Sequence, residues 1–124
     1  MMLRLMLIAG CGGFIGTSLR FLINKLFVMF WKLPFPLATF VINITGCFAF
    51  GIITGFLQKS GIISPKLNAF LIVGFCGGFT TFSTFSFEAL SLGFTSQAIL
   101  SLCYIALSVF AGLLATWAGI AISS

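Results

Sequence analysis

The sequence has no histidine, no aspartate and a single glutamate, Glu88, among its 124 residues. Charged residues make up only 6% of the chain, whereas soluble proteins average about 25%. Acid–base pairs, nucleophilic triads and carboxylate metal sites all need side chains that are missing here. We therefore predict that the protein is not an enzyme.

Metal-binding thiol clusters and basic patches are missing as well. The four cysteines, at positions 11, 47, 76 and 103, have no CxxC spacing and no histidine to join them, so a zinc or iron–sulfur site is not expected. We interpret them as small apolar packing residues. The six lysines and arginines are scattered, which argues against nucleic-acid binding. No organic cofactor is expected.

What the chain does contain is long apolar runs, since 60% of its residues are hydrophobic. A helix needs about 20 mostly apolar residues to span the hydrocarbon core of a bilayer. The runs are too long and too regular for alternating strands. We predict an all-α membrane protein of the cell membrane, a single four-helix domain over 1–124 with spans at about 3–27, 36–58, 67–91 and 97–121.

The cations are nearly balanced between the two sides of this topology. One side holds Arg4, Lys59 and Lys66, and the other holds Lys25 and Lys32, with Arg20 as a third cation if it snorkels that way. A lysine and arginine bias normally sets the orientation of a membrane protein. Its near absence predicts dual topology, in which opposed copies pair as an antiparallel homodimer. The alternative is that a single orientation is weakly encoded and fixed by other factors.

Segment 74–88 is the most unusual part of the chain, because a membrane span here carries adjacent glycines, several hydroxyls, spaced phenylalanines and Glu88. Gly77-Gly78 weakens the helix, and the hydroxyls of Thr80, Thr81, Ser83 and Thr84 can bond the freed backbone groups. Such broken spans present carbonyls and half-helix ends to ions. We predict a broken third helix and a permeation or ion-binding site.

Phenylalanine adds a second feature to that segment. Phe82 and Phe85 share a helix face, and the positive edge of an aromatic ring can face an anion. The alternative interpretation is packing, since 17 phenylalanines are spread along the chain.

Polar residues also occur in the other spans. Thr39 and Asn43 lie four apart on one face of the second span, and Tyr104 and Ser108 belong to a polar stripe with Ser101 in the fourth. These groups either serve a site or form interhelical hydrogen bonds. Arg20 lies inside the first span, where a cation is either functional or snorkels to the interface; the sequence leaves both open.

Three segments together resemble the CrcB/Fluc fluoride channels of microbes. They are GGFIGTSLR at 12–20, TFVINITG at 39–46 and GFCGGFTTFSTF at 74–85. The resemblance runs through all four spans in order, and the third-span motif is its most specific part. It implies an antiparallel dual-topology homodimer with two separate pores, which exports fluoride passively and so confers fluoride resistance.

The resemblance also implies roles for individual residues. Phe82 and Phe85 would turn their ring edges to fluoride, and Asn43 would donate hydrogen bonds to it. Tyr104 and Ser108 would form a polar track. Further hydroxyls near the path would be those of Thr39, Ser83 and Thr84. The backbone carbonyls of Gly77 and Thr80 from both copies would hold a structural sodium ion, and Glu88 matches an acidic position of the family.

Three departures accompany the resemblance. Thr17 stands where alanine is usual, Ala38 where glycine is, and Gly112 where some members continue the hydroxyl track. Two other functions stay open: a small multidrug-type proton-coupled exporter and a membrane scaffold subunit that transports nothing. The exporter needs a membrane carboxylate, usually in the first span, whereas Glu88 lies in the third.

Overall fold

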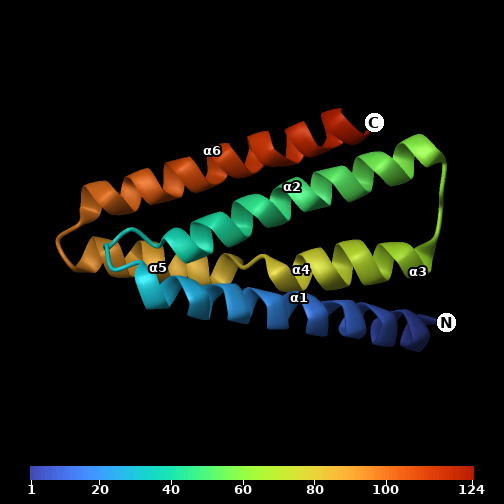
Figure 1. Ribbon diagram of the computed structural model, residues 1–124, viewed down its shortest axis with the longest axis horizontal. Coiled ribbons are helices and arrows are strands. Elements are labelled where there is room, and N and C mark those ends of the chain that lie inside the picture. The colour runs from blue at the N-terminus through green and yellow to red at the C-terminus, as the bar shows by residue number, and fades with distance from the viewer.

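The computed structural model describes residues 1–124, and the chain is all-helical (Figure 1). The long helices are α1 (Met2–Phe30), α2 (Leu37–Ser60) and α6 (Ala98–Ser123). The third span consists of α3 (Pro65–Leu67), the π-helical η1 (Asn68–Cys76), α4 (Gly77–Phe79) and α5 (Phe82–Phe94). All four stretches, the third taken as Pro65–Phe94, are long and apolar enough to cross a membrane. The four-span, all-helical prediction is confirmed, and the helices extend slightly past most of the predicted limits.

The turns between spans follow from local sequence. α1 ends where Trp31 becomes extended, and the indole N–H of Trp31 donates to the carbonyl of Phe35 at 2.7 Å. α2 ends at Gly61, whose φ of 68° suits glycine. The third span begins with Ser64, whose Oγ accepts from the Leu67 amide at 3.2 Å, followed by Pro65 in the first turn.

Glycines set which helices approach one another. A Cβ added to Gly12 or Gly16 of α1 would collide with the carbonyls of Phe70 and Phe75 in η1. Likewise, Gly51 of α2 packs against the backbone of α6 around Thr116. Small residues allow this backbone contact where lipid supplies no hydrophobic drive. The consequence is two close pairs, α1 with the first half of the third span and α2 with α6.

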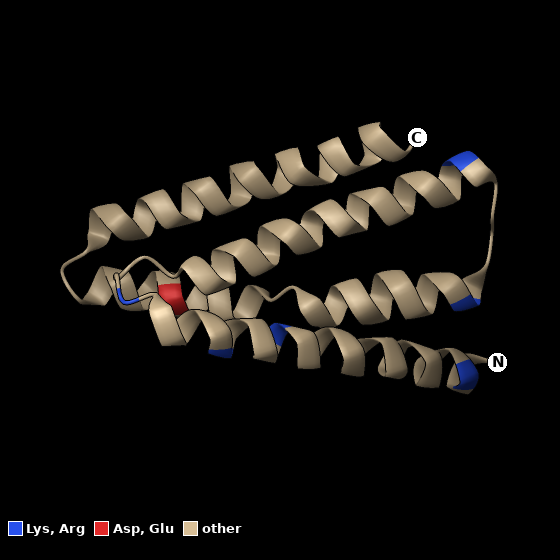
Figure 2. Cartoon of the chain, viewed as in Figure 1, with Lys and Arg blue, Asp and Glu red and all other residues tan.

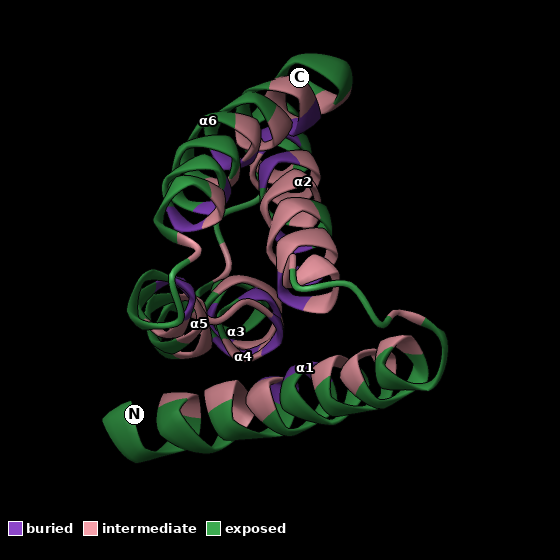
Figure 3. Cartoon of the chain, turned by 90° about the vertical axis from the view of Figure 1, so that its left-hand side faces the viewer, coloured by how far each residue is buried: buried purple, intermediate pink, exposed green.

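The end-on view shows how these pairs combine (Figure 3). α1 lies along one side of the bundle, the third span lies in the middle, and α2 and α6 lie beyond it. The second half of the third span, α5, packs on α6 rather than on α1. The third span therefore changes partner about midway along its length.

Few side chains are shielded by the chain itself. Only 17 of 124 residues are buried, so most apolar side chains face outward, as they do in a bundle surrounded by lipid. The most deeply buried side chains are Tyr104, Ile42, Thr39 and Cys76.

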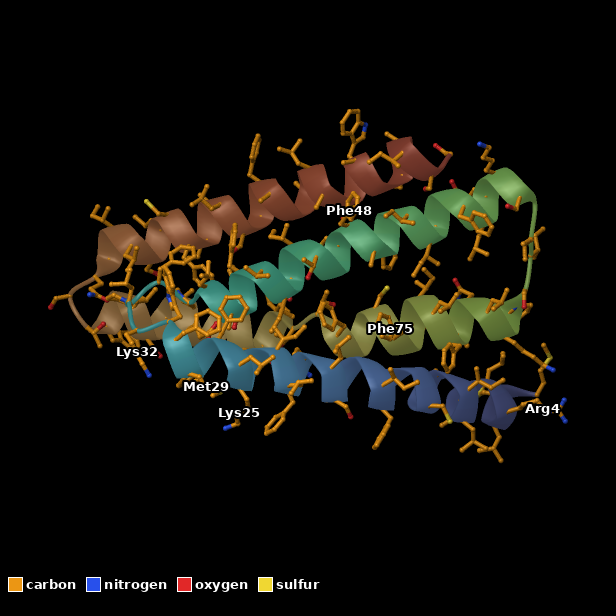
Figure 4. All side chains as sticks on the ribbon, viewed as in Figure 1. Arg4, Lys25, Met29, Lys32, Phe48 and Phe75 are labelled. Atoms are coloured by element: carbon orange, nitrogen blue, oxygen red, sulfur yellow. The ribbon has the colours of Figure 1, made fainter.

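All the cations except Arg20, which lies well inside α1, are found toward the two ends of the bundle (Figure 2). Arg4 is at the end that holds the N-terminus, and Lys25 and Lys32 lie toward the opposite end (Figure 4). Lys59 in the last turn of α2 and Lys66 in α3 belong to the same end as Arg4. The membrane-spanning middle contains little charge.

Candidate functional site

Two extended residues, Thr80 and Thr81, separate α4 from α5. Their φ/ψ values are −81°/157° and −146°/120°. In a continuous helix the amides of Thr81 and Thr84 would bond the carbonyls of Gly77 and Thr80. Here the Thr81 amide donates to Asn43 Oδ1 at 2.8 Å, and the Thr84 amide donates to Thr81 Oγ1 at 3.3 Å. Both carbonyls thus lose their usual helical donors.

The helix stops after Phe79, not at the glycine pair. Gly77 and Gly78 are both helical, and Gly78 is needed for packing, since a Cβ there would lie 2.8 Å from the carbonyl oxygen of Gly13. Thr81 caps the next helix through its hydroxyl. The glycines therefore bring α1 close, whereas the threonine begins α5.

Asn43 holds the extended segment from the side of α2. Its Nδ2 donates to the Thr81 carbonyl at 3.0 Å, while its Oδ1 accepts from the amide of the same residue. A carboxamide has two N–H donors, so one of them is left over from this paired contact. Asn43 therefore both fixes the backbone and keeps a neutral donor.

Two residues of α1 hold the segment from the other side. Arg20 Nε donates to the Gly78 carbonyl at 3.0 Å, and Thr17 Oγ1 donates to the same oxygen at 3.3 Å. The half-buried arginine thus bonds the third span through Nε.

A cavity of about 240 Å³ opens beside the extended segment. No charged side chain lines it. Its walls are Asn43 and Cys47 of α2, Thr80, Thr81, Phe82 and Phe85 of the third span, and Ser108 and Val109 of α6. The rings of Phe82 and Phe85 are 5.8 Å apart and tilted by 46°. Phe82 is 79% exposed, so this side of the cavity is open in the single chain.

Ser108 is the unusual member of the cavity wall. Its Oγ is a buried polar side-chain atom without a hydrogen-bond partner. Buried hydroxyls are nearly always bonded, and an orphan costs stability. Ser108 thus brings an unpartnered hydroxyl to the wall of a cavity that is otherwise neutral and partly aromatic.

A second polar cluster adjoins this cavity through Phe85. The phenol of Tyr104, which is fully buried, donates to Glu88 Oε1 at 3.0 Å, and Thr39 lies beside them. The ring of Phe85 is 5.1 Å from that of Tyr104.

The structure therefore divides the predicted site residues into groups. Asn43, Phe82, Phe85 and Ser108 share the cavity. Thr39, Tyr104 and Glu88 form the neighbouring cluster. Ser83 is exposed and Thr84 half-buried, and neither lines the cavity.

A further cavity of about 450 Å³ lies between α2 and the third span. Gly77 and Thr80 line it together with Gly46, Cys47, Phe50, Ile72, Val73, Cys76 and Thr116. It meets the first cavity at Cys47 and Thr80, which line both.

The hydroxyl of Thr81 bonds a freed backbone amide, as predicted, and it does so as the N-cap of α5. Thr17, in contrast, has a role that the sequence did not indicate. The contact of Thr17 with Gly78 depends on the register between two helices, which no local pattern reports.

Comparison with known proteins agrees with these motifs. The family model described as CrcB-like protein, Camphor Resistance (CrcB), matches residues 7–120. A Flavobacterium psychrophilum protein named fluoride-specific ion channel FluC is 46% identical over 112 residues, which are 90% of each chain. Proteins with the same name from Pseudomonas fluorescens and Stutzerimonas stutzeri are 43% and 41% identical over 122 residues, 98% of each chain. With four apolar helices, the chain is a multi-pass membrane protein and belongs to the CrcB family.

Proposed function

We propose that the protein is a fluoride-selective ion channel. The observation that carries this proposal is one cavity lined by Ser108, whose hydroxyl has no partner, by Asn43, which has a spare N–H, and by the two residues Phe82 and Phe85. The relatives named as fluoride-specific channels support it.

The chemistry of the cavity suits a small, strongly hydrated anion. Neutral donors and ring edges replace part of its water shell. Because no cation lines the cavity, the anion is not held too tightly to leave, and conduction requires easy release. The Tyr104–Glu88–Thr39 cluster continues the polar path from Phe85, with Ser83 and Thr84 as further hydroxyls near it.

Transport is passive and directed outward in a living cell. A pore has no coupled energy source, and a cell interior at about −40 to −90 mV repels anions. Fluoride therefore leaves the cytoplasm down its electrochemical gradient, which lowers the internal concentration.

The working unit is an antiparallel dual-topology homodimer with a discontinuous third span. The balanced cations at the two ends of the bundle support it, as does the exposed Phe82, which leaves the cavity wall incomplete in one chain. A second copy would supply that wall and cover the larger cavity between α2 and the third span.

A sodium ion fits the centre of such a dimer. The carbonyls of Gly77 and Thr80 lose their helical donors to Asn43 and Thr81, and both residues line one cavity. Carbonyl oxygens are suitable ligands for a hard cation. The ion would supply a fixed positive charge that holds the two third spans together.

Fluoride efflux from liposomes tests the proposal. Purified protein is reconstituted in vesicles loaded with potassium fluoride, valinomycin sets the voltage, and a fluoride electrode records release. We expect electrogenic fluoride efflux and no chloride efflux from matched vesicles loaded with potassium chloride. Proton-coupled uptake of a cationic drug without fluoride current would favour an exporter, and no flux of either kind would favour a scaffold.

A further inference from the structure

Arg20 has no assigned role, yet it makes a specific contact with the third span. Its Nε lies 3.0 Å from the Gly78 carbonyl oxygen. That oxygen would bond the amide of Phe82 in a continuous helix, but α4 ends at Phe79. The carbonyl is thus at the C-terminal end of the half-helix that precedes the extended segment.

The location of the charge suits this contact. The C-terminal end of a helix carries partial negative charge, and a cation there is stabilising. A hydrogen bond with a charged donor is also stronger than one between neutral groups. Thr17 adds a second, neutral donor to the same oxygen at 3.3 Å.

Close packing allows the contact to form. Gly13 of α1 touches Gly78 directly, with no room for a side chain on the latter. Arg20 and Thr17 are three residues apart and therefore project from the same face of α1. This face reaches the third span two residues before Thr80, while Asn43 bonds Thr81 from α2.

We infer that Arg20, assisted by Thr17, is a positioning residue that fixes the end of the first half of the third span and thereby sets the geometry of the Thr80–Thr81 segment beside the pore. It acts through the Gly78 carbonyl and not by contact with the permeating ion. The inference rests on the proposed function only where it concerns conduction.

The peptide bond between Thr80 and Thr81 can be observed selectively by isotope labelling, and its NMR signal reports on this geometry directly. Thr80–Thr81 is the only Thr-Thr pair in the chain, so protein labelled with ¹³C′,¹⁵N-threonine gives a single one-bond amide correlation, that of Thr81. In Arg20→Gln we expect this signal to shift or broaden, and in Arg20→Lys to move less, because the charge is kept. Asn43→Ala must move it too, since Asn43 accepts from this amide.

Lys25→Gln is the matched control. Lys25 is on the same helix but lies over the Phe21 ring, 5.3 Å from its centroid. Removing this charge should leave the Thr81 signal and the fluoride flux unchanged. In the same liposome assay Arg20→Gln should lower the flux by about tenfold, as expected for one lost charge-assisted hydrogen bond, with the dimer intact.

The inference is wrong if Arg20→Gln leaves the Thr81 signal where it is in the unmodified protein. If that variant does not assemble, Thr17→Val decides: a shift of the signal supports the inference and an unmoved signal overturns it. Absence of fluoride flux in the unmodified protein would refute the proposed function but leave the spectroscopic result interpretable.

Discussion

At the scale of single residues, hydrogen bonding distinguishes polar atoms that stabilise the fold from those that we propose serve the pore. Two serines of α6 illustrate the difference. Ser101 is buried and donates to the Ala89 carbonyl at 2.6 Å, whereas Ser108 Oγ has no partner. A satisfied hydroxyl contributes to folding, whereas an orphan costs stability and is retained for another reason.

Replacement of the two serines should therefore have opposite effects. Ser108→Ala should leave the unfolding free energy unchanged or slightly raised and reduce fluoride flux several-fold. Ser101→Ala should lower the unfolding free energy by about 0.6–1.5 kcal/mol and leave the flux per folded dimer unchanged. Unfolding in mixed micelles and efflux from liposomes measure the two quantities. A Ser108→Ala protein with full flux would remove this hydroxyl from the path.

The two aromatic rings of the cavity should matter for conduction more than for assembly. Phe82→Ile and Phe85→Ile keep apolar volume but lose the ring edge. A ring contact contributes about 1 kcal/mol, so each variant should lower fluoride efflux by about fivefold while the dimer persists on size exclusion. Phe85 also contacts Tyr104, and its replacement should be the more severe of the two. Unchanged rates in both would mean that the rings only pack.

At the scale of whole helices, glycine faces determine which spans meet. Gly16→Ala should place a methyl group against the Phe75 carbonyl and lower the unfolding free energy by about 1–3 kcal/mol, as overpacking does. Gly10, on the same helix, has nothing within 4 Å of an added Cβ. Gly10→Ala should be neutral or slightly stabilising, because alanine is the better helix former. Equal losses in both variants would argue against the close backbone contact of α1 with η1 at Gly16.

The local sequence predicts the four spans better than it predicts which residues of different helices contact each other. Apolar length alone predicted the four spans, because the bilayer sets that length. The reciprocal contact of Asn43 with Thr81 and the contact of Arg20 with Gly78 were not predictable. Both depend on how far one helix slides along another, and this register is fixed by the glycine contacts rather than by the residues that bond.

At the scale of the whole molecule, Arg4, Lys59 and Lys66 lie at one end and Lys25 and Lys32 toward the other, whereas Arg20 bonds the third span from within α1. Reporters fused to the C-terminus should therefore appear on both sides of the membrane. Ser60→Lys with Ser124→Lys should place the C-terminus only in the cytoplasm, following the positive-inside rule. A single orientation in the unmodified protein would contradict the antiparallel arrangement.

Lysines added at the opposite end of the bundle supply a control on assembly. Leu33 and Thr95 lie at the opposite end and are exposed, so lysines there should fix the reverse orientation. Each fixed form alone should conduct poorly, and co-expression of the two should restore fluoride flux.

The pairing of helices also has a consequence for synthesis at the ribosome. α1 and α2 are made first but contact each other little, because α1 packs on the third span and α2 on α6 (Figure 3). The helix pair α1–α2 thus enters the lipid before the partners of its glycine faces, η1 and α6, have been made. Only the last helix to be made, α6, completes the bundle. We expect a nascent chain arrested in the loop after α2 to be degraded unless fragment 65–124 is supplied separately.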